Sequence, residues 1–414
     1  MNKQAFLFGV CASGALRLQG EEHLQELERL CDTYGFSVCG KNLSVLKKRD
    51  AGLYLGKGKL QEIFLQISTL PVDILIFDEE LSPNQQRNLE AFFKRPVIDR
   101  TELILEVFAK HAKTKEAHLQ IELAKIRYEL PRLKRMWTHL SRQSSGGGHV
   151  KGEGEKQIEI DRRLLKRRLC QLEKELEEVI LHRKTQRLLR ERSHVPTIAI
   201  VGYTNAGKST LMRALTGADV LIEDKLFATL DTTTRKHTLP NKQDILLIDT
   251  VGFIRKIPHT LIKAFKSTLE EAIHTDILIH LIDASHLEAV SQAEATLSVL
   301  KELGVQDKPI LTVLNKIDVC PIYSAALLDP KNISISAVTG QGLDLLQAKI
   351  MEVLSSLRTM LHLRVPQEDY GLLSDMWREG KVLEISYEDN DVLLMVEVPK
   401  ILEIKLAKYR ILEQ

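Results

Sequence analysis

The sequence lacks the marks of a membrane protein or a disulfide-bonded secreted protein. Among its 414 residues, no apolar run approaches the ~20 residues needed to span a bilayer. Residues 1–10 carry one basic residue and too short an apolar stretch for a signal peptide. The five cysteines are odd in number and scattered, with no CxxC pair, which favours free thiols over disulfides or zinc. These absences predict a cytoplasmic protein.

A strong net charge is also missing, because the formal value is only +2. The balance is local, however, since residues 111–192 hold 21 lysines and arginines against 12 aspartates and glutamates, a net charge of +9. A basic segment in an otherwise acidic protein is typical of nucleic-acid binding. A long solvated helix pair is also charged as a rule, so composition alone leaves both interpretations open.

What the sequence does contain is a phosphate-binding loop. Residues 202–209 read GYTNAGKS, the GxxxxGK[ST] pattern, between an apolar run predicted to be a strand and a helix-like segment. Its backbone N–H groups can surround an anion at the helix N-terminus. Lys208 is expected to reach the β- and γ-phosphates, and the Ser209 hydroxyl to hold Mg²⁺. The predicted GTP contacts of this loop are Gly202, Tyr203, Thr204, Asn205, Ala206, Gly207, Lys208, Ser209 and Thr210.

Two further motifs each end an apolar run predicted to be a buried strand. In the DxxG sequence at 249–252, Asp249 is expected to bind the metal, directly or through water, and the Gly252 N–H to face the γ-phosphate. In the NKID sequence at 315–318, Asp318 is expected to accept hydrogen bonds from guanine N1–H and its 2-amino group, which adenine lacks. Residues 336–338 complete the set behind the base. The predicted contacts are Asp249, Thr250, Val251, Gly252, Asn315, Lys316, Ile317, Asp318, Ser336, Ala337 and Val338.

The γ-phosphate sensor is expected in residues 225–234. A threonine there can give its hydroxyl to Mg²⁺ and its backbone N–H to the γ-phosphate, but Thr229, Thr232, Thr233 and Thr234 crowd together, and the residues alone do not choose among them. The predicted contacts in this segment are Phe227, Ala228, Thr229, Leu230 and Asp231.

Intrinsic hydrolysis is predicted to be slow. Many GTPases place a glutamine after the DxxG glycine to orient the attacking water, whereas Phe253 stands there in this chain. Arg235 is a weak candidate for an arginine finger. Asn205 is similar to the asparagine that holds potassium in cation-dependent GTPases, so K⁺ beside the phosphates is expected to take that role.

Residues 111–192 carry two heptad seams, which predict an antiparallel helical hairpin with arms of about 25 residues. Pro131 is expected to kink the first arm, and the glycine-rich tip spans 144–154. The first seam is Leu119, Leu123, Ile126, Leu130, Leu133, Trp137 and Leu140, and the second is Leu165, Leu169, Leu172, Leu176 and Val179. If the hairpin enters RNA, the expected phosphate partners are Arg132, Lys134, Arg135, Arg142, Lys151, Arg162, Arg163, Arg167 and Arg168.

The remaining segments complete an α/β organisation. Residues 1–110 alternate strand-like and helix-like runs and predict a small α/β domain with a parallel sheet, in which the Gly56–Gly58 turn is either structural or anion-binding. Residues 193–358 are assigned to the P-loop GTPase domain, and 359–414 to a small α+β appendage.

At these residues the chain resembles the HflX family of the Obg–HflX GTPase class. The matching strings are GYTNAGKSTL at 202–211, LFATLD at 226–231, DTVGFIRKIPH at 249–259, NKID at 315–318 and SAVTGQG at 336–342, together with segments 52–60 and 146–163. The resemblance implies Thr229 as the sensor, binding to the large ribosomal subunit near its peptidyl-transferase region, and ribosome splitting or rescue under stress. Thr232 departs from the family's proline, and the 148–154 loop carries lysine and glutamate for its arginine and proline.

We therefore predict a Mg²⁺-dependent GTPase switch that acts on the ribosome and its RNA. Two alternatives stay open at this point. One is an RNA-remodelling NTPase that uses ATP through the N-terminal domain, and the other is a signalling switch whose partner is a protein.

Overall fold

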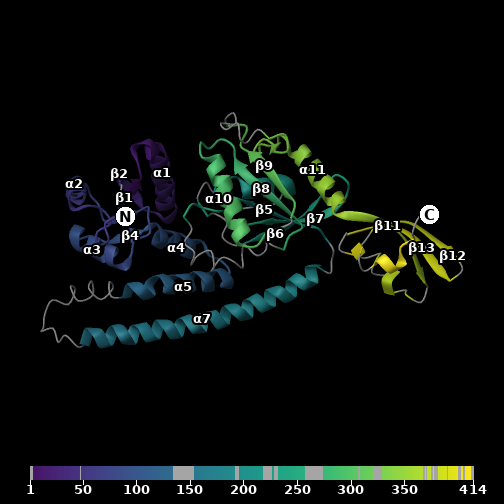
Figure 1. The fold of residues 1–414 in the computed structure, drawn as a ribbon, viewed down its shortest axis with the longest axis horizontal. Coiled ribbons are helices and arrows are strands. Elements are labelled where there is room, and N and C mark those ends of the chain that lie inside the picture. The colour runs from purple at the N-terminus through teal and green to yellow at the C-terminus, as the bar shows by residue number, and fades with distance from the viewer. Residues whose placement is uncertain are drawn as a thin grey trace. The chain divides into compact units, whose positions relative to one another are not determined.

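The computed structural model describes most of the chain in two compact units (Figure 1). The first unit comprises Met1–Ile180, Leu221–Thr232 and Thr250–Glu270, and the second comprises Leu181–Val220, Thr233–Asp249 and Glu271–Gln414. The described residues are 3–46, 48–133, 153–191, 195–217, 226–227, 232–256, 274–305, 308–319, 329–366, 369, 371–373, 376, 381–388, 390–399, 402–403 and 406–411. Within them, no helix is long and apolar enough to cross a bilayer.

The N-terminal sheet is parallel, with strand order β2-β1-β3-β4. Its strands are β1 Gln4–Cys11, β2 Ser37–Val45, β3 Ile74–Phe77 and β4 Val97–Asp99, and the accompanying helices are η1 Gly14–Leu16, α1 Arg17–Tyr34, α2 Lys57–Ser68, α3 Pro83–Phe93 and α4 Arg100–His111. The predicted small parallel α/β domain is thus confirmed. Ser82 caps α3 and forms a full capping box with Gln85. Helices α2 and α4 had no sequence prediction.

Two faces of this sheet are covered. Phe6, Phe8 and Phe77 pack with side chains of α2 and α3 in one apolar cluster. Helix α1 packs on the other face, where Leu24 lies against Gly9 of β1. Because β1 pairs with β2 on one side and with β3 on the other, the carboxyl ends of β1 and β3 border the position at which ligands often bind in such sheets.

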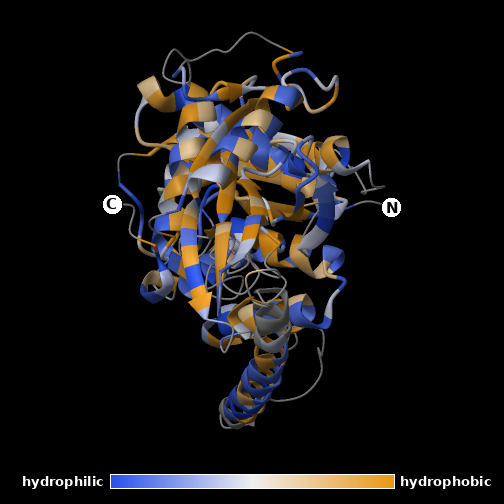
Figure 2. Ribbon diagram, turned by 90° about the vertical axis from the view of Figure 1, so that its right-hand side faces the viewer, coloured by the Kyte–Doolittle hydropathy of each residue, from blue (hydrophilic) through white to orange (hydrophobic). Residues whose placement is uncertain are grey.

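The helical hairpin follows, with α5 Lys115–Glu129, the 3₁₀ turn η2 Leu130–Arg132 and α7 Glu153–Glu191. Helices α5 and α7 lie antiparallel and side by side (Figure 1), and the predicted seam residues from Leu119 to Leu130 pack against those of α7 around Leu172. Trp137, Leu140 and the predicted tip up to residue 152 lie outside the described residues. Helix α5 ends at Glu129, and the 3₁₀ turn that follows it contains Pro131, at the interruption that the sequence predicted. Helix α7 comprises 39 residues. Figure 2 shows that α7 is mostly hydrophilic between its apolar seam residues.

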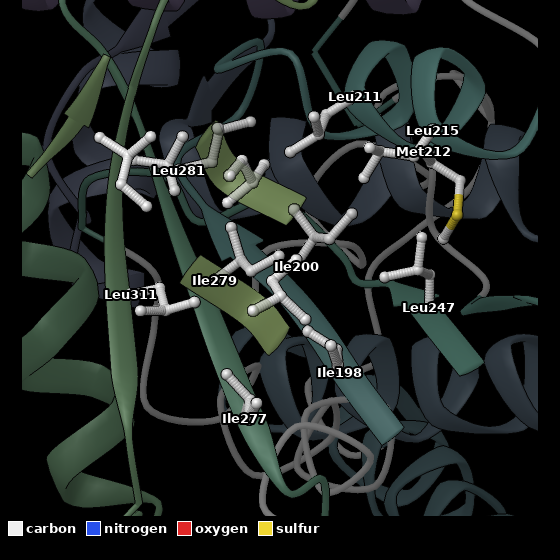
Figure 3. Packing of buried hydrophobic residues seen from close by; sticks show 14 of the residues in the cluster. Ile198, Ile200, Leu211, Met212, Leu215, Leu247, Ile277, Ile279, Leu281 and Leu311 are labelled. Atoms are coloured by element: carbon white, nitrogen blue, oxygen red, sulfur yellow. The ribbon is translucent and has the colours of Figure 1, made fainter. Parts of the chain in front are cut away.

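The second unit contains a six-stranded sheet of order β10-β9-β8-β5-β7-β6, parallel except for β6. Its strands are β5 Thr197–Gly202, β6 Thr233–Thr238, β7 Asp244–Asp249, β8 Ile277–Asp283, β9 Ile310–Asn315 and β10 Ile333–Ser334, and its helices are α8 Lys208–Thr216, α10 Ala289–Glu302 and α11 Leu343–Ser356. Residues such as Ile198, Ile200 and Ile279 form the core against Leu211 of α8 (Figure 3).

A small antiparallel sheet ends the chain, with strand order β11-β13-β12. It consists of β11 Arg358–Pro366, β12 Lys381–Glu388 and β13 Asp391–Pro399, followed by the 3₁₀ turn η5 Ala407–Tyr409. Its own buried cluster includes Leu363 and Val396.

Candidate nucleotide site

The carboxyl edge of the six-stranded sheet brings three predicted motifs together. The P-loop follows β5, Asp249 ends β7 and Asn315 ends β9. These strands are parallel, so their carboxyl ends meet at one edge, which is where ligands bind in open α/β sheets.

Gly207 permits the close approach of the P-loop to β9. Its φ of 95° lies in the left-handed region, and a Cβ there would stand 2.3 Å from Asn315 Nδ2. A side chain is excluded both by conformation and by space. Helix α8 begins at the next residue, so its N-terminal N–H groups and positive dipole end open toward the loop, the arrangement that suits a phosphate.

Lys208 is held inside this loop. Its ammonium donates to the carbonyl oxygens of Gly202, at 3.2 Å, and Tyr203, at 2.8 Å. Burial lowers the pKa of Lys208 to about 8, against the opposing effect of the Asp249 carboxylate. An ammonium has three donors, so an anion in the loop would supply a third acceptor and favour the charged form.

Ser209 and Asp249 place two oxygen ligands side by side. The Ser209 hydroxyl donates to Asp249 Oδ2 at 2.7 Å, and Asp249 is fully buried. Oxygen donors are what Mg²⁺ prefers, and adjacent ligands of an octahedral Mg²⁺ lie about 3 Å apart. The two residues therefore fit this cation. The third predicted ligand, Thr229, lies outside the described residues.

Asn315 connects two loops through one carboxamide. Its Nδ2 donates to the Ala206 carbonyl at 2.8 Å, and its Oδ1 accepts the Ala337 N–H at 3.0 Å. The side chain is 2% exposed, so both bonds lie away from water. Asn315 thereby fixes the P-loop to the 336–338 loop from behind.

The remaining residues that were predicted to contact the base lie next to Asn315 in the sequence or in the 336–338 loop that it holds. Lys316 adopts a left-handed φ of 68° and its ammonium pairs with Asp283 Oδ2 at 2.7 Å. Asp318 is exposed, as a carboxylate that accepts from a ligand should be. The 336–338 loop closes on itself, since the Gly340 N–H donates to the Ser336 carbonyl at 2.9 Å, and Val338 is 78% exposed.

Some predicted nucleotide contacts do not lie in the same compact unit as the P-loop, Asp249 and Asn315. Phe227, Thr250, Val251 and Gly252 fall in the first compact unit, with the N-terminal domain. Residues 228–231 lie outside the described residues. Asp283 was not predicted, although its position was informative, because it ends the apolar strand β8 beside β9.

One predicted phosphate partner is wrong. The Arg132 guanidinium is buried, donates to the Leu81 carbonyl at 2.6 Å and to Gln86 Oε1 at 3.1 Å, and stacks on the Tyr128 ring at 3.6 Å. It holds the hairpin base to the N-terminal domain and is not available to RNA. Arg168 pairs with Glu122 across the hairpin at 2.8 Å.

The other candidates on α7, Arg162, Arg163 and Arg167, are exposed. Lys134, Arg135, Arg142 and Lys151 lie outside the described residues.

Comparison with known proteins assigns the family. Three family models match successive parts of the chain: "GTP-binding GTPase N-terminal" over residues 21–109, "GTP-binding GTPase Middle Region" over 111–190 and "50S ribosome-binding GTPase" over 197–316. The GTPase HflX of Chlamydia pneumoniae is 46% identical over 397 residues, covering 94% of this chain and 84% of that protein. The chain belongs to the HflX family of GTPases. The GTPase HflX of Akkermansia muciniphila is 44% identical over 99% of this chain and 97% of its own length, and that of Escherichia coli K12 is 40% identical over 91% and 90%.

As an HflX-family member, the chain is a P-loop GTPase that hydrolyses GTP. Among solved structures, a GTP-binding protein of Sulfolobus solfataricus in complex with GDP is 31% identical, with 86% of this chain and 99% of that chain covered and a TM-score of 0.45.

Proposed function

We propose that this GTPase is a cytoplasmic switch that binds the large ribosomal subunit through its helical hairpin and acts in splitting or rescuing ribosomes under stress. The matched family model carries 50S binding in its description. The observation that carries the proposal is a row of cations along α7.

The cationic row faces away from the hairpin seam. Four basic residues and two neutral ones line one surface groove of α7: Arg163, Lys166, Arg167, Cys170, Gln171 and Lys174. Their spacing of three and four residues places them on one helix face. At 100° per residue this face is turned roughly 190° from the seam around Leu172. No carboxylate interrupts the row, so it suits a polyanionic backbone.

Within the GTPase domain, we assign guanine selection to Asp318 and phosphate binding to the P-loop. Lys208 would contact the β- and γ-phosphates, and Ser209 and Asp249 would hold Mg²⁺. The metal ion would neutralise charge on the phosphate oxygens. Thr229 and Gly252 are the proposed γ-phosphate sensors, whose loops order with GTP and release after hydrolysis.

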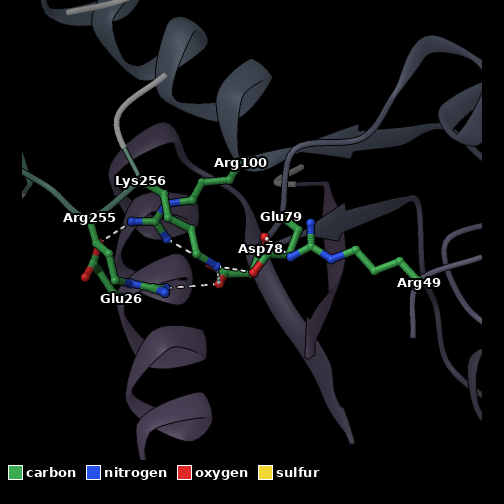
Figure 4. Close-up of polar contacts among 7 residues, drawn as sticks. All are labelled: Glu26, Arg49, Asp78, Glu79, Arg100, Arg255 and Lys256. Carbon is green, nitrogen blue, oxygen red and sulfur yellow. Dashed lines mark hydrogen bonds and ion pairs between the residues drawn. The ribbon is translucent and has the colours of Figure 1, made fainter. Parts of the chain in front are cut away.

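The ATP alternative finds no support at the N-terminal sheet. Asp78 and Glu79 follow the carboxyl end of β3, which pairs with β1, and these carboxylates are paired with cations of the chain itself (Figure 4). A nucleotide phosphate would have to compete with these carboxylates for the same cations. The Gly56–Lys57 turn forms the start of α2.

The decisive test is subunit co-sedimentation over a range of salt concentrations. Arg167→Gln with Lys174→Gln should weaken binding and flatten its dependence on salt, because fewer counterions are released. The matched control is Lys242→Gln with Lys301→Gln, which removes the same charge from exposed positions elsewhere. Equal binding by both double variants would refute an RNA contact at this face. Binding that survives RNase treatment of the partner would favour a protein-partner switch.

Deleting residues 144–152 provides a second test of the hairpin. GTP affinity should persist, because the GTPase domain has its own core. Ribosome-stimulated hydrolysis should be lost. Full stimulation of a folded deletion variant would show that the tip is not needed for coupling.

A further inference from the structure

The base of the hairpin is joined to the N-terminal domain by a buried cluster of polar side chains around Arg132. This residue is the last of η2, which follows α5, and it is 6% exposed. The N-terminal domain, α5 and the first part of α7 belong to the same compact unit. Arginine is rarely buried to this degree unless its donors are paired, so the partners of the guanidinium show what Arg132 holds.

The Arg132 guanidinium contacts both the N-terminal domain and the hairpin. Its Nε donates to Gln86 Oε1 on α3 at 3.1 Å, and its Nη2 donates to the Leu81 carbonyl at 2.6 Å. On the side of the hairpin, its Nη1 donates to the Tyr128 carbonyl of α5 at 3.0 Å, and the guanidinium lies over the Tyr128 ring, 3.6 Å from the centroid. A cation over an aromatic face is attracted by it. One side chain thus connects the two parts.

Asp99 completes the charge balance of this cluster. It is fully buried, and its carboxylate accepts the N–H groups of Leu81 at 3.0 Å and Glu102 at 2.9 Å, with Arg132 Nη2 at 3.6 Å. Burial raises the pKa of Asp99 to about 6, against the opposing effects of the two N–H groups and the Arg132 cation. Because unpaired buried charges are costly, Arg132 and Asp99 each stabilise the other in the interior.

A second bridge between the two parts passes through Glu102, in the first turn of α4. Glu102 Oε2 accepts from Gln86 Nε2 at 2.9 Å and from the Tyr128 hydroxyl at 3.3 Å. Since Arg132 contacts both Gln86 and Tyr128, these four side chains form a closed ring. Two of its members belong to the N-terminal domain and two to the hairpin. Buried networks whose members are all paired favour a single arrangement of the surrounding elements.

The other interactions at this junction specify its direction less sharply. Lys125 of α5 pairs with Glu106 of α4 at 2.7 Å, but the two side chains are 27% and 38% exposed, and such pairs contribute little. Hydrophobic burial is non-directional, whereas hydrogen bonds require defined lengths and angles. The angle at which the hairpin leaves the N-terminal domain therefore depends mainly on the buried ring.

From these contacts we propose that Arg132 is a positioning residue that fixes the direction of the hairpin relative to the N-terminal domain, so that both meet the large ribosomal subunit as one body. The proposal rests on the proposed binding of that subunit through the hairpin. If the hairpin samples several directions, only the chains in the competent direction bind, and the apparent affinity falls with their fraction. The Arg132 cation itself contacts no phosphate, so the salt dependence of binding should not depend on it.

The direction of the hairpin can be measured on the full chain without any partner. One spin label is attached to Cys170, which is exposed on α7, and the other to Gln61→Cys, at an exposed position of α2. Cys39→Ser and Cys320→Ser restrict labelling to these two positions. Pulsed dipolar spectroscopy then gives the distribution of distances between the hairpin and the N-terminal domain. Arg132 in place should give one narrow distribution.

Two variants open the ring from opposite sides. Arg132→Gln removes the guanidinium, and Tyr128→Leu removes the ring beneath it and the hydroxyl but leaves the Arg132 charge in place. Each should broaden the distance distribution or divide it into several distances. Arg163→Gln is the matched control, because it removes the same charge from an exposed position of α7, and it should keep the narrow distribution.

Co-sedimentation of the unlabelled chains with the large subunit provides the functional readout. Arg132→Gln and Tyr128→Leu should bind about tenfold more weakly, which corresponds to about one chain in ten in the competent direction, with the salt slope of the wild type. Arg163→Gln should lower that slope by about one. GDP affinity should stay unchanged in all variants, because the GTPase domain has its own core. Thermal unfolding checks that each variant is folded under the conditions of the assay.

The possible outcomes separate this proposal from the proposed function. Narrow distributions in both ring variants, or broad ones with undiminished subunit binding, overturn the positioning role. A lower salt slope in Arg132→Gln would make Arg132 a phosphate ligand and overturn it as well. A wild-type chain that does not bind the subunit overturns the proposed function, while the distances still decide whether Arg132 fixes the hairpin. If Arg132→Gln does not fold, Tyr128→Leu decides by the same criteria.

Discussion

Asn315→Ala tests whether a single buried carboxamide holds the nucleotide site together. The substitution leaves the Ala206 carbonyl and the Ala337 N–H without their partners at 2.8 and 3.0 Å. An unsatisfied buried group costs about 1–3 kcal/mol. Because the two groups share one side chain, their costs are not simply additive, and we expect a total of about 2–4 kcal/mol.

The predicted consequence is loss of nucleotide affinity. At 1.4 kcal/mol per factor of ten, GDP binding should weaken roughly 30-fold or more if most of this cost falls on the bound state. Fluorescent GDP titration measures the affinity, and thermal unfolding without nucleotide measures the part that falls on the fold. Asn241→Ala, at an exposed turn position, is the matched control.

Gly207→Ala tests the contact between Asn315 and the P-loop by a change in the P-loop itself. Its methyl group would stand 2.3 Å from Asn315 Nδ2 and would occupy a φ of 95°, so it should displace the carboxamide and weaken GDP binding in the same direction. If Asn315→Ala binds GDP within threefold of wild type and unfolds at the same temperature, the two hydrogen bonds do not organise the site and this reasoning is refuted.

Three shorter predictions concern the ligands themselves. Lys208→Met keeps the buried volume but removes the ammonium that donates to the P-loop carbonyls, and GTP affinity measured by titration should fall at least about tenfold. Asp318→Asn should move affinity from GTP toward XTP, because a carboxamide can donate to the 2-oxo group of xanthine; unchanged GTP affinity would contradict the guanine assignment. Turnover should be slow, and faster in KCl than in NaCl, if Asn205 helps to hold K⁺; equal fast rates in both salts would contradict this.

The local sequence was sufficient to predict those candidate site residues that directly follow a strand. The P-loop, Asp249 and Asn315 each end a short apolar run, and such runs indicate buried parallel strands. Parallel strands place their carboxyl ends at one edge, so the meeting of the three motifs followed from their order alone. The hairpin seam was predictable for the same reason, since its heptad spacing is local.

Contacts between residues far apart in sequence were not predictable. Arg132 looked like a phosphate ligand because it stands in a basic segment, but its partners include the Leu81 carbonyl and Gln86, 51 and 46 positions away. No feature of the sequence near position 132 indicates these distant partners. Pro131, by contrast, correctly marked an interruption of the helix, because the effect of proline on the backbone is local.

The N-terminal sheet and the sheet of the GTPase domain differ in the charge that they present at the carboxyl ends of their parallel strands. Each presents loops at the carboxyl ends of its strands, where N–H groups and side chains can meet a ligand. In the GTPase domain this edge has a glycine loop, the Lys208 ammonium and the start of α8, which suit an anion. In the N-terminal domain the edge has Asp78 and Glu79, which suit cations, and it receives Arg255 and Lys256. The charge at the strand ends thus distinguishes the two edges, because one suits the phosphates of a nucleotide and the other is already paired with Arg255 and Lys256 of the chain itself.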